Sequence, residues 1–218
     1  MRNWQTERVA AAEDRIAAEV PVALTYNRIS HVVMMATPAD LEDFALGFSL
    51  TEGIIGAKDD LLAVRVLPRE GGIEVAMTIT EPWFDRLATQ RRNLTGRTGC
   101  GLCGAERIEQ ALRYPAAVGD SLRISHAALQ KALAGLQAQQ PLQAVTGATH
   151  GAAWCDVEGA ILLAREDVGR HNALDKLIGA LTREGFDPRR GFVLVSSRAS
   201  YEMVYKAAVV GMELVVAV

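Results

Sequence analysis

The sequence has few cysteines, few aromatic residues and no long hydrophobic run. Its 218 residues include three cysteines, and aromatic residues make up 6%. No segment approaches the roughly 18 continuous apolar residues of a membrane-spanning helix, and the polar stretch Met1 to Glu19 lacks the apolar core of a signal peptide. We therefore expect a cytoplasmic protein without a membrane partner. In that compartment a close cysteine pair is more often catalytic or metal-binding than a structural disulfide.

An excess of basic charge is also missing. The formal net charge of −3 argues against a general nucleic-acid binder. Half of the residues are hydrophobic and 22% are charged, which is typical of a globular protein. The length allows one large domain or two small ones.

The most distinctive segment holds two of the cysteines, Cys100 and Cys103, among three glycines in residues 98–104. Glycine lets such a loop adopt tight turns that leave little bulk around the two sulfurs. Helix-favouring residues 105–112 follow at once, and Arg91, Arg92 and Arg97 precede the loop. A helix N-terminus and nearby positive charge both favour thiolate over thiol. The pattern indicates a reactive, nucleophilic or redox cysteine.

Zinc binding is one alternative for this pair. A structural zinc site needs about four ligands, and the other possible ligands in the chain are Cys155, His150, His171, His126 and His31. His150 and Cys155 are the best completion, although their spacing is a loose match. A dithiol oxidoreductase and a merely structural pair remain open as well. A thioredoxin-like motif would follow a strand, and none is expected directly before Cys100.

The first half of the chain predicts two hairpins and two helices. Runs at 20–26 and 31–36 resemble one hairpin, and 61–67 and 73–80 form a second around Gly71. Between them, Thr37 is expected as the N-cap and Pro38 as the first residue of a helix that ends near Gly53. Residues 83–94 form the other helix.

The second half predicts an α/β layer with a mainly parallel sheet. After a helix at about 105–113, Ser125 opens another that ends before Pro141, and a hairpin joins 152–156 to 160–164. A helix after Asn172, a strand at 192–195, a helix at 201–210 and a strand at 214–218 then alternate. We divide the chain into an N-terminal lead-in (1–19), a first lobe (20–95), the cysteine loop (96–104) and an α/β lobe (105–218).

Two polar turns follow apolar strands and precede helices in the α/β lobe, where open sheets of this class place their ligands. The first turn carries Asp167, Arg170, His171 and Asn172, and the second carries Ser196, Ser197 and Arg198. Free N–H groups, hydroxyls and arginines suit an anion. The alternative is plain helix capping by Asp167, Asn172, Ser197 or Ser200, with His171 idle.

Together these motifs resemble the FdhD-type sulfur carriers, accessory proteins of formate dehydrogenases. The resemblance covers nearly the whole chain from about Val20. It rests on residues 20–27, 45–48, 52–55, the loop at 96–104, and the two turns with their helices at 166–176 and 196–203.

The resemblance implies a sulfurtransferase. Such a protein takes persulfide sulfur from a cysteine desulfurase on Cys100, with Cys103 as helper. It passes the sulfur to the molybdenum (or tungsten) bis-pterin guanine dinucleotide cofactor that formate dehydrogenase needs. A homodimer without a permanently bound cofactor or metal is implied, with the two polar turns as candidates for contacting the anionic cofactor. A zinc-stabilised chaperone that binds the cofactor without covalent chemistry is the alternative function.

The fold implied is a three-layer lobe like the cytidine deaminases with a small additional α+β lobe. Deaminase chemistry is not supported, because the cysteine pair precedes His150 and no glutamate follows that histidine at the required spacing. Family members continue past the position of Val218 through a helix and a glycine-containing segment implicated in binding the guanine nucleotide. We therefore expect the C-terminal part of the family fold to be missing here.

Overall fold

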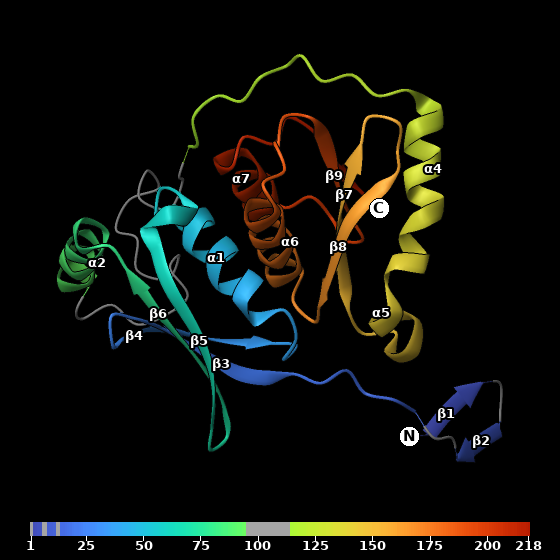
Figure 1. Ribbon diagram of the computed structural model, residues 1–218. Helices are drawn as coiled ribbons and strands as arrows, with labels where there is room; N and C mark the ends of the chain where they lie inside the picture. The colour runs from blue at the N-terminus through green and yellow to red at the C-terminus, as the bar shows by residue number, and fades with distance from the viewer. Residues whose placement is uncertain (1, 6–7, 12–13, 95–113) are drawn as a thin grey trace.

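In the computed structural model, two four-stranded sheets lie on either side of a central pair of helices, α1 (Leu41–Thr51) and α6 (Arg170–Glu184) (Figure 1). The structure describes residues 2–5, 8–11, 14–94 and 114–218. A separate hairpin of β1 (Arg2–Gln5) and β2 (Arg8–Ala11) comes first. The loop with Cys100 and Cys103, and the helix expected at 105–113, lie outside the described residues.

The first sheet consists of two hairpins, as the sequence predicts. Strand β3 (Val20–Tyr26) is antiparallel to β4 (Ile29–Ala36), and β5 (Leu61–Arg69) is antiparallel to β6 (Gly72–Ile79). Parallel pairing of β3 with β6 joins them in the order β4-β3-β6-β5. Alternate residues of β3 are buried against one face of α1, as the periods of strand and helix require. The short 3-10 helix η1 (Lys58–Asp60) precedes β5, and α2 (Glu81–Leu94) follows β6.

The second sheet corrects the prediction of mainly parallel pairing. Its order is β10-β9-β7-β8, formed by β7 (His150–Asp156), β8 (Ile161–Asp167), β9 (Gly191–Val195) and β10 (Val215–Ala217). The expected alternation does give three strands of one direction, β8, β9 and β10, connected through α6 and α7 (Tyr201–Val209). However, β7 forms a hairpin with β8 and also pairs antiparallel with β9. Because β7 lies between β8 and β9, the parallel neighbours among the described strands of this sheet are β9 and β10.

Helices cover both faces of the second sheet, which makes this lobe three-layered in the described residues. Ala152, Trp154 and Val193 pack with α6 and α7, while Ala153 and Cys155 pack with α4 (His126–Leu136). Ser125 opens α4, as predicted, and the structure makes Ser125 its N-cap, since the hydroxyl accepts a hydrogen bond from Ala128 N at 3.0 Å. This helical stretch ends before Pro141, as predicted, through η2 (Gln137–Gln139), and Pro141 then begins a further short helix, α5 (Pro141–Thr146), which was not predicted from the sequence. A specific relation to the cytidine deaminases remains a prediction.

The two lobes meet where α1 crosses α6 at very short range. A Cβ on Gly47 would overlap the backbone carbonyl of Asp175, and one on Gly179 would overlap that of Asp43. The missing side chains therefore allow direct backbone contact between helices that belong to different lobes.

Candidate functional site

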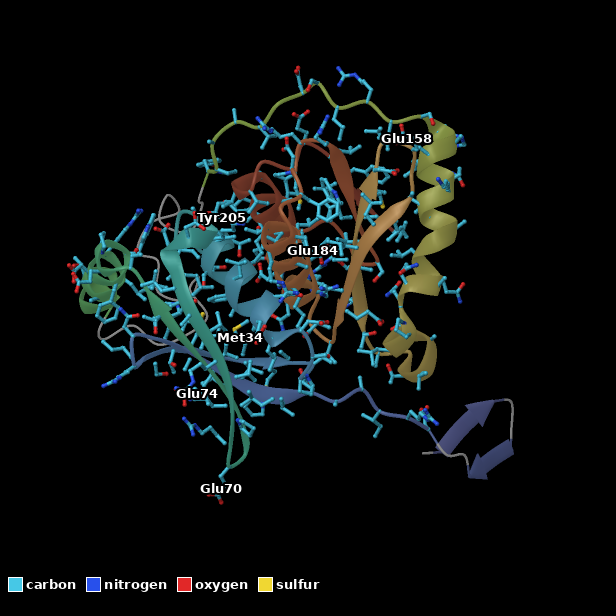
Figure 2. The ribbon with its side chains drawn as sticks, viewed as in Figure 1. Met34, Glu70, Glu74, Glu158, Glu184 and Tyr205 are labelled. Carbon is cyan, nitrogen blue, oxygen red and sulfur yellow. The ribbon has the colours of Figure 1, made fainter. Side chains whose placement is uncertain are left out.

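The two predicted polar turns meet at one end of the second sheet. His150, the first residue of β7, pairs with Asp167, the last residue of β8. Gly151 exchanges hydrogen bonds with Ser196, directly after β9, at 2.8 and 2.9 Å. The reversed direction of β7 thus brings its first residues to the carboxyl ends of β8 and β9, the usual ligand-binding edge of such sheets. Helix α5 lies at this end (Figure 1), and Glu158 marks the opposite end (Figure 2).

Asp167 and Asn172 lie inside a buried polar network. One carboxylate oxygen of Asp167 contacts Lys176 Nζ at 2.7 Å, and neither side chain is exposed. The other oxygen accepts from Gly169 N at 2.8 Å and from Asn172 Nδ2 at 3.0 Å. Asn172 also donates to Met35 O at 2.9 Å, in β4. The structure gives both residues a scaffolding role, and direct cofactor contact by either one is still a prediction.

Thr37 belongs to the same network rather than capping a helix, so the predicted helix start is wrong. Its N–H donates to Asp167 Oδ2 at 3.0 Å, its carbonyl accepts from Lys176 Nζ at 2.9 Å, and its hydroxyl accepts from Val168 N at 3.2 Å. Helix α1 begins later, at Leu41, after Asp40 in a left-handed conformation (φ 53°). The Thr37 hydroxyl, which an N-cap would use to accept from the first turn of its own helix, accepts instead from Val168 N in the other lobe.

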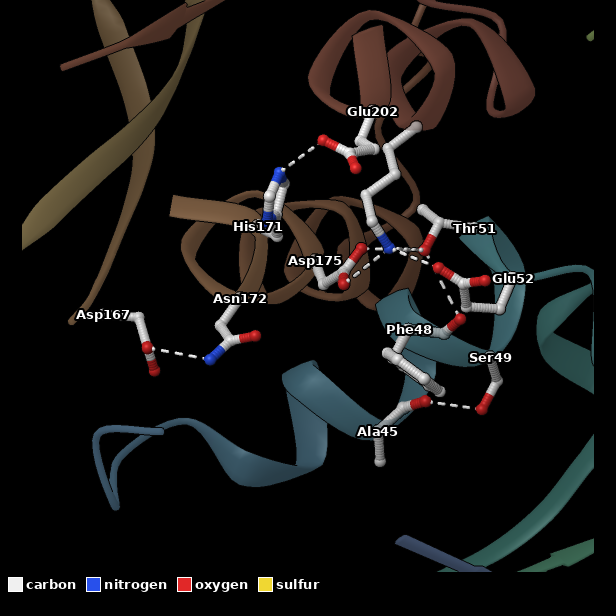
Figure 3. A network of polar contacts seen from close by, with 11 residues as sticks. Ala45, Phe48, Ser49, Thr51, Glu52, Asp167, His171, Asn172, Asp175 and Glu202 are labelled. Atoms are coloured by element: carbon white, nitrogen blue, oxygen red, sulfur yellow. Dashed lines mark hydrogen bonds and ion pairs between the residues drawn. The ribbon is translucent and has the colours of Figure 1, made fainter. Parts of the chain in front are cut away.

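Arg170 and His171 form the first turn of α6 and keep exposed surface at the edge. His171 Nε2 lies 3.3 Å from Glu202 Oε2 in α7 (Figure 3). Burial and then the charge of Arg170 lower the pKa of His171, against the opposing effect of Glu202. The imidazole is therefore neutral near neutral pH. The Nε of Arg170 is buried and has no partner among the described residues.

The second turn separates into exposed and buried groups. Ser196 is half-buried and Arg198 is exposed, whereas Ser197 is buried and its hydroxyl donates to Arg198 O at 3.4 Å. Ser200 occupies the N-cap position of α7, and its hydroxyl contacts Glu202 at 3.3 Å instead of a backbone N–H. Among the seven predicted cofactor residues, four therefore present surface at this edge: Arg170, His171, Ser196 and Arg198.

Sequence reasoning missed a second buried network that holds α7 against α1 and α6. Lys206 Nζ donates to Thr51 Oγ1, Glu52 Oε1 and Asp175 Oδ2, each at 2.9 Å (Figure 3). Burial raises the pKa of Asp175 despite this ion pair. For Lys206, burial alone would lower the pKa, but the charges of Asp175 and Glu52 outweigh it and raise the value. The sequence offered one signal for this network, because Lys206 stands among the apolar residues of the α7 pattern.

The predicted completion of a zinc site is not found. Cys155 is buried on the α4 face of the sheet, while alternation along β7 directs His150 to the other face. Burial, with a smaller effect of Asp156, raises the pKa of the Cys155 thiol to about 12. In the part of the chain that the structure describes, no cluster of His, Cys, Asp or Glu could hold a metal ion. Within those same residues, no helix is long and apolar enough to cross a membrane.

Comparison with known proteins gives one consistent result. The model of the FdhD/NarQ family matches residues 17–218. A protein named "Sulfur carrier protein FdhD" from Bordetella petrii is 52% identical over 209 residues, covering 96% of this chain and 75% of the relative. A protein of the same name from Cupriavidus necator is 54% identical over 215 residues, covering 99% of this chain and 75% of the relative.

A solved structure also matches. The crystal structure of a formate dehydrogenase accessory protein from Desulfotalea psychrophila has a TM-score of 0.75 and 21% identity, covering 100% of this chain and 80% of that one. At this identity the likeness concerns the fold alone.

Proposed function

The chain belongs to the FdhD/NarQ family, and on that ground we propose that it carries sulfur on Cys100 for the maturation of formate dehydrogenase. Relatives 52% and 54% identical bear the name sulfur carrier protein. The observation that carries the assignment to the loop is the state of the third cysteine. Cys155 is buried, and its thiol pKa is raised to about 12. That leaves Cys100 and Cys103 as the reactive thiols of the chain.

Loading begins with a persulfide on a cysteine desulfurase. The Cys100 thiolate attacks the terminal sulfur of that persulfide, and a new sulfur–sulfur bond forms on Cys100. The bond within the donor breaks, and the donor cysteine leaves as a thiolate. Glycines around Cys100 favour this step, because the thiol must reach a sulfur on a second protein.

Delivery uses the second cysteine. The Cys103 thiolate attacks Cys100 Sγ, hydrosulfide leaves, and a Cys100–Cys103 disulfide remains, which a cellular dithiol reductant then returns to two thiols. The hydrosulfide becomes a ligand of the metal in the bis-pterin guanine dinucleotide cofactor, the substrate of the transfer. This order of roles makes Cys100 the carrier and Cys103 the resolving thiol.

The polar edge of the second sheet is the site proposed for the cofactor. Arg170 and Arg198 supply positive charge for its phosphates, and the neutral imidazole of His171 adds a hydrogen-bonding group beside them. The buried residues Asp167, Asn172 and Ser197 stabilise the two turns through hydrogen bonds within them. Support comes from the meeting of these turns at one edge, which the β7 pairing produces.

Formate dehydrogenase activity in cells that lack their own sulfur carrier tests the proposal. The wild-type chain and a Cys155→Ala variant should restore activity, while Cys100→Ala should not. Restoration by Cys100→Ala would refute the carrier role. A zinc-stabilised chaperone predicts instead stoichiometric zinc in the purified protein that is lost on Cys100→Ala substitution, which metal analysis detects.

A further inference from the structure

Strand β5 forms an open border of the first sheet (Figure 1), and β6 is its one neighbour among the described strands. Alternate residues of a strand direct their N–H and C=O groups to opposite sides, so every second residue of β5 points these groups at the open side. Native proteins usually protect such an edge with a bulge, a proline or a charge. Here the bulge lies between Leu61 and Ala63, Pro68 stands near the end, and Arg65, opposite Ala76, lies on the outer face of the sheet. The middle of the β5 edge is therefore unprotected.

The side chains of β5 on the core face of the sheet are aliphatic. Val64 and Val66 lie opposite Met77 and Val75, which are buried in the core with α1. Helix α1 does not cover the edge strand fully, because Val66 remains 38% exposed and Leu62, at the bulge, 61% exposed. An open edge with exposed aliphatic side chains is a template for pairing with another chain.

Two cavities lie beside this edge, between β5 and the helices α1 and α6. The larger, of about 640 Å³, is lined by Leu62 and Val64 from β5 and by Leu46 from α1. The smaller, of about 290 Å³, is lined by Val66 and Leu41. Because side chains two residues apart on a strand face the same way, about 7 Å from each other, a strand laid beside β5 directs alternate side chains toward these cavities.

The two cavities differ in charge. Carboxylates and cations are equal in number in the lining of the larger one. The smaller has three carboxylates, Asp40, Glu42 and Asp43, against one cation, Arg183. Asp43 is neutralised by Arg183 at 2.9 Å and by Arg165 at 2.8 Å. Asp40 and Glu42 have exposed side chains and longer ion pairs, of 3.7 and 3.8 Å, so the smaller cavity favours a cationic side chain.

We propose that β5 is the docking edge for an extended segment of a partner protein, which adds to the first sheet as a further strand. Its main chain bonds to the open side of β5, and an aliphatic side chain enters the larger cavity beside Leu62. A lysine or arginine four residues away, level with Val66, lies beside Asp40 and Glu42. In strand addition the main chain supplies affinity and alternate side chains supply specificity. Docking here is a binding function separate from sulfur transfer on Cys100.

A second copy of the chain is a poorer occupant of this edge. Pairing of β5 with β5 of another copy offers aliphatic side chains, from Val64 and Val66, on the core face. The acidic cavity would then receive no cation from the added strand. A basic residue in the segment is therefore the feature that distinguishes a partner from a second copy.

Fluorescence anisotropy with two labelled peptides tests the proposal on the full chain. Each peptide alternates threonine with leucine, valine and arginine, and the two have opposite orders because the added strand can run in either direction. One should bind, and Leu62→Glu should weaken it by about tenfold or more. Glu42→Gln should weaken it by about two- to fivefold and reduce its salt dependence. Val33→Glu, on a residue 59% exposed in the opposite edge strand β4, is the matched control and should bind like the wild type.

Backbone methylation of the bound peptide tests the main-chain bonds. Of two versions N-methylated on alternate residues, the one methylated on the side that faces β5 should lose binding and the other should keep it. Binding of neither original peptide, equal binding of the two methylated versions, or undiminished binding by Leu62→Glu and Glu42→Gln would overturn the proposal. A wild-type dimer that Leu62→Glu dissociates in sedimentation equilibrium would assign the edge to a second copy and overturn it as well.

Discussion

Replacement of Lys206 by methionine should strongly destabilise the protein, because it leaves a buried carboxylate without its cation. Methionine keeps most of the side-chain volume, which limits the change to the ammonium group. Asp175 is 2% exposed and Lys206 is 7% exposed at a distance of 2.9 Å. After the substitution, the 2.7 Å hydrogen bond from Thr51 remains to Asp175. A hydroxyl does not balance a full negative charge in such surroundings.

Breaking a buried ion pair on one side costs about 3–5 kcal/mol. The total free energy of unfolding of a domain is about 5–15 kcal/mol, so the loss should be a large part of it. Asp175→Asn in the Lys206→Met background removes the uncompensated charge. We therefore expect the double variant to be more stable than Lys206→Met alone.

Urea unfolding of the wild type, the two single variants and the double variant measures this coupling. The deficit of Lys206→Met should also shrink as the pH falls, since burial raises the pKa of Asp175 and protonation then favours the folded state. Arg189→Met, which breaks an exposed ion pair with Asp187, is the matched control and should change little. A Lys206→Met loss below about 1 kcal/mol, or strictly additive losses in the double variant, would refute the reasoning.

Three further predictions concern other parts of the fold. Gly179→Ala should lower the free energy of unfolding by roughly 1–3 kcal/mol or more, because the new methyl meets the Asp43 carbonyl. The control Gly135→Ala in α4 meets only a side-chain methyl at 3.4 Å. Urea unfolding should show it to be neutral or stabilising. The folded-state pKa of His171 is lowered by burial, so its contribution to stability is present above the ordinary histidine pKa and is lost as the pH falls through the lowered value. Unfolding of His171→Gln should lack this part of the pH dependence, and an unchanged profile would contradict it. Iodoacetamide at neutral pH should label Cys100 and Cys103 but leave Cys155 unmodified in the folded protein, as peptide mass spectrometry can check.

The local elements of this fold could be predicted where the signals act within a few residues. The hairpin of β3 and β4 follows from two β-branched runs around Asn27 and Arg28, which adopt positive φ angles. The helix start at Ser125 is predictable because a serine hydroxyl at this position can accept from a backbone N–H three residues later, as Ser125 does from Ala128 N. Such signals depend on the order of residues alone.

The remaining features depend on partners that are distant in the sequence. Thr37 is a residue type that often caps helices, but its N–H donates to Asp167, 130 positions later in the sequence. The direction of β7 depends on its hairpin with β8 and on its pairing with β9, and no local pattern reveals the second of these. Gln140 stands in a polar Ala- and Gln-rich stretch, and only the approach of Gly151 shows that its side chain is buried.

The most direct test of the central claim is the mass of the protein after incubation with a cysteine desulfurase and cysteine. We predict one added sulfur atom per chain, located by peptide mapping on Cys100, present in Cys155→Ala and absent in Cys100→Ala. An unmodified wild-type chain, or a sulfur adduct that persists in Cys100→Ala, would contradict the claim that Cys100 carries the sulfur.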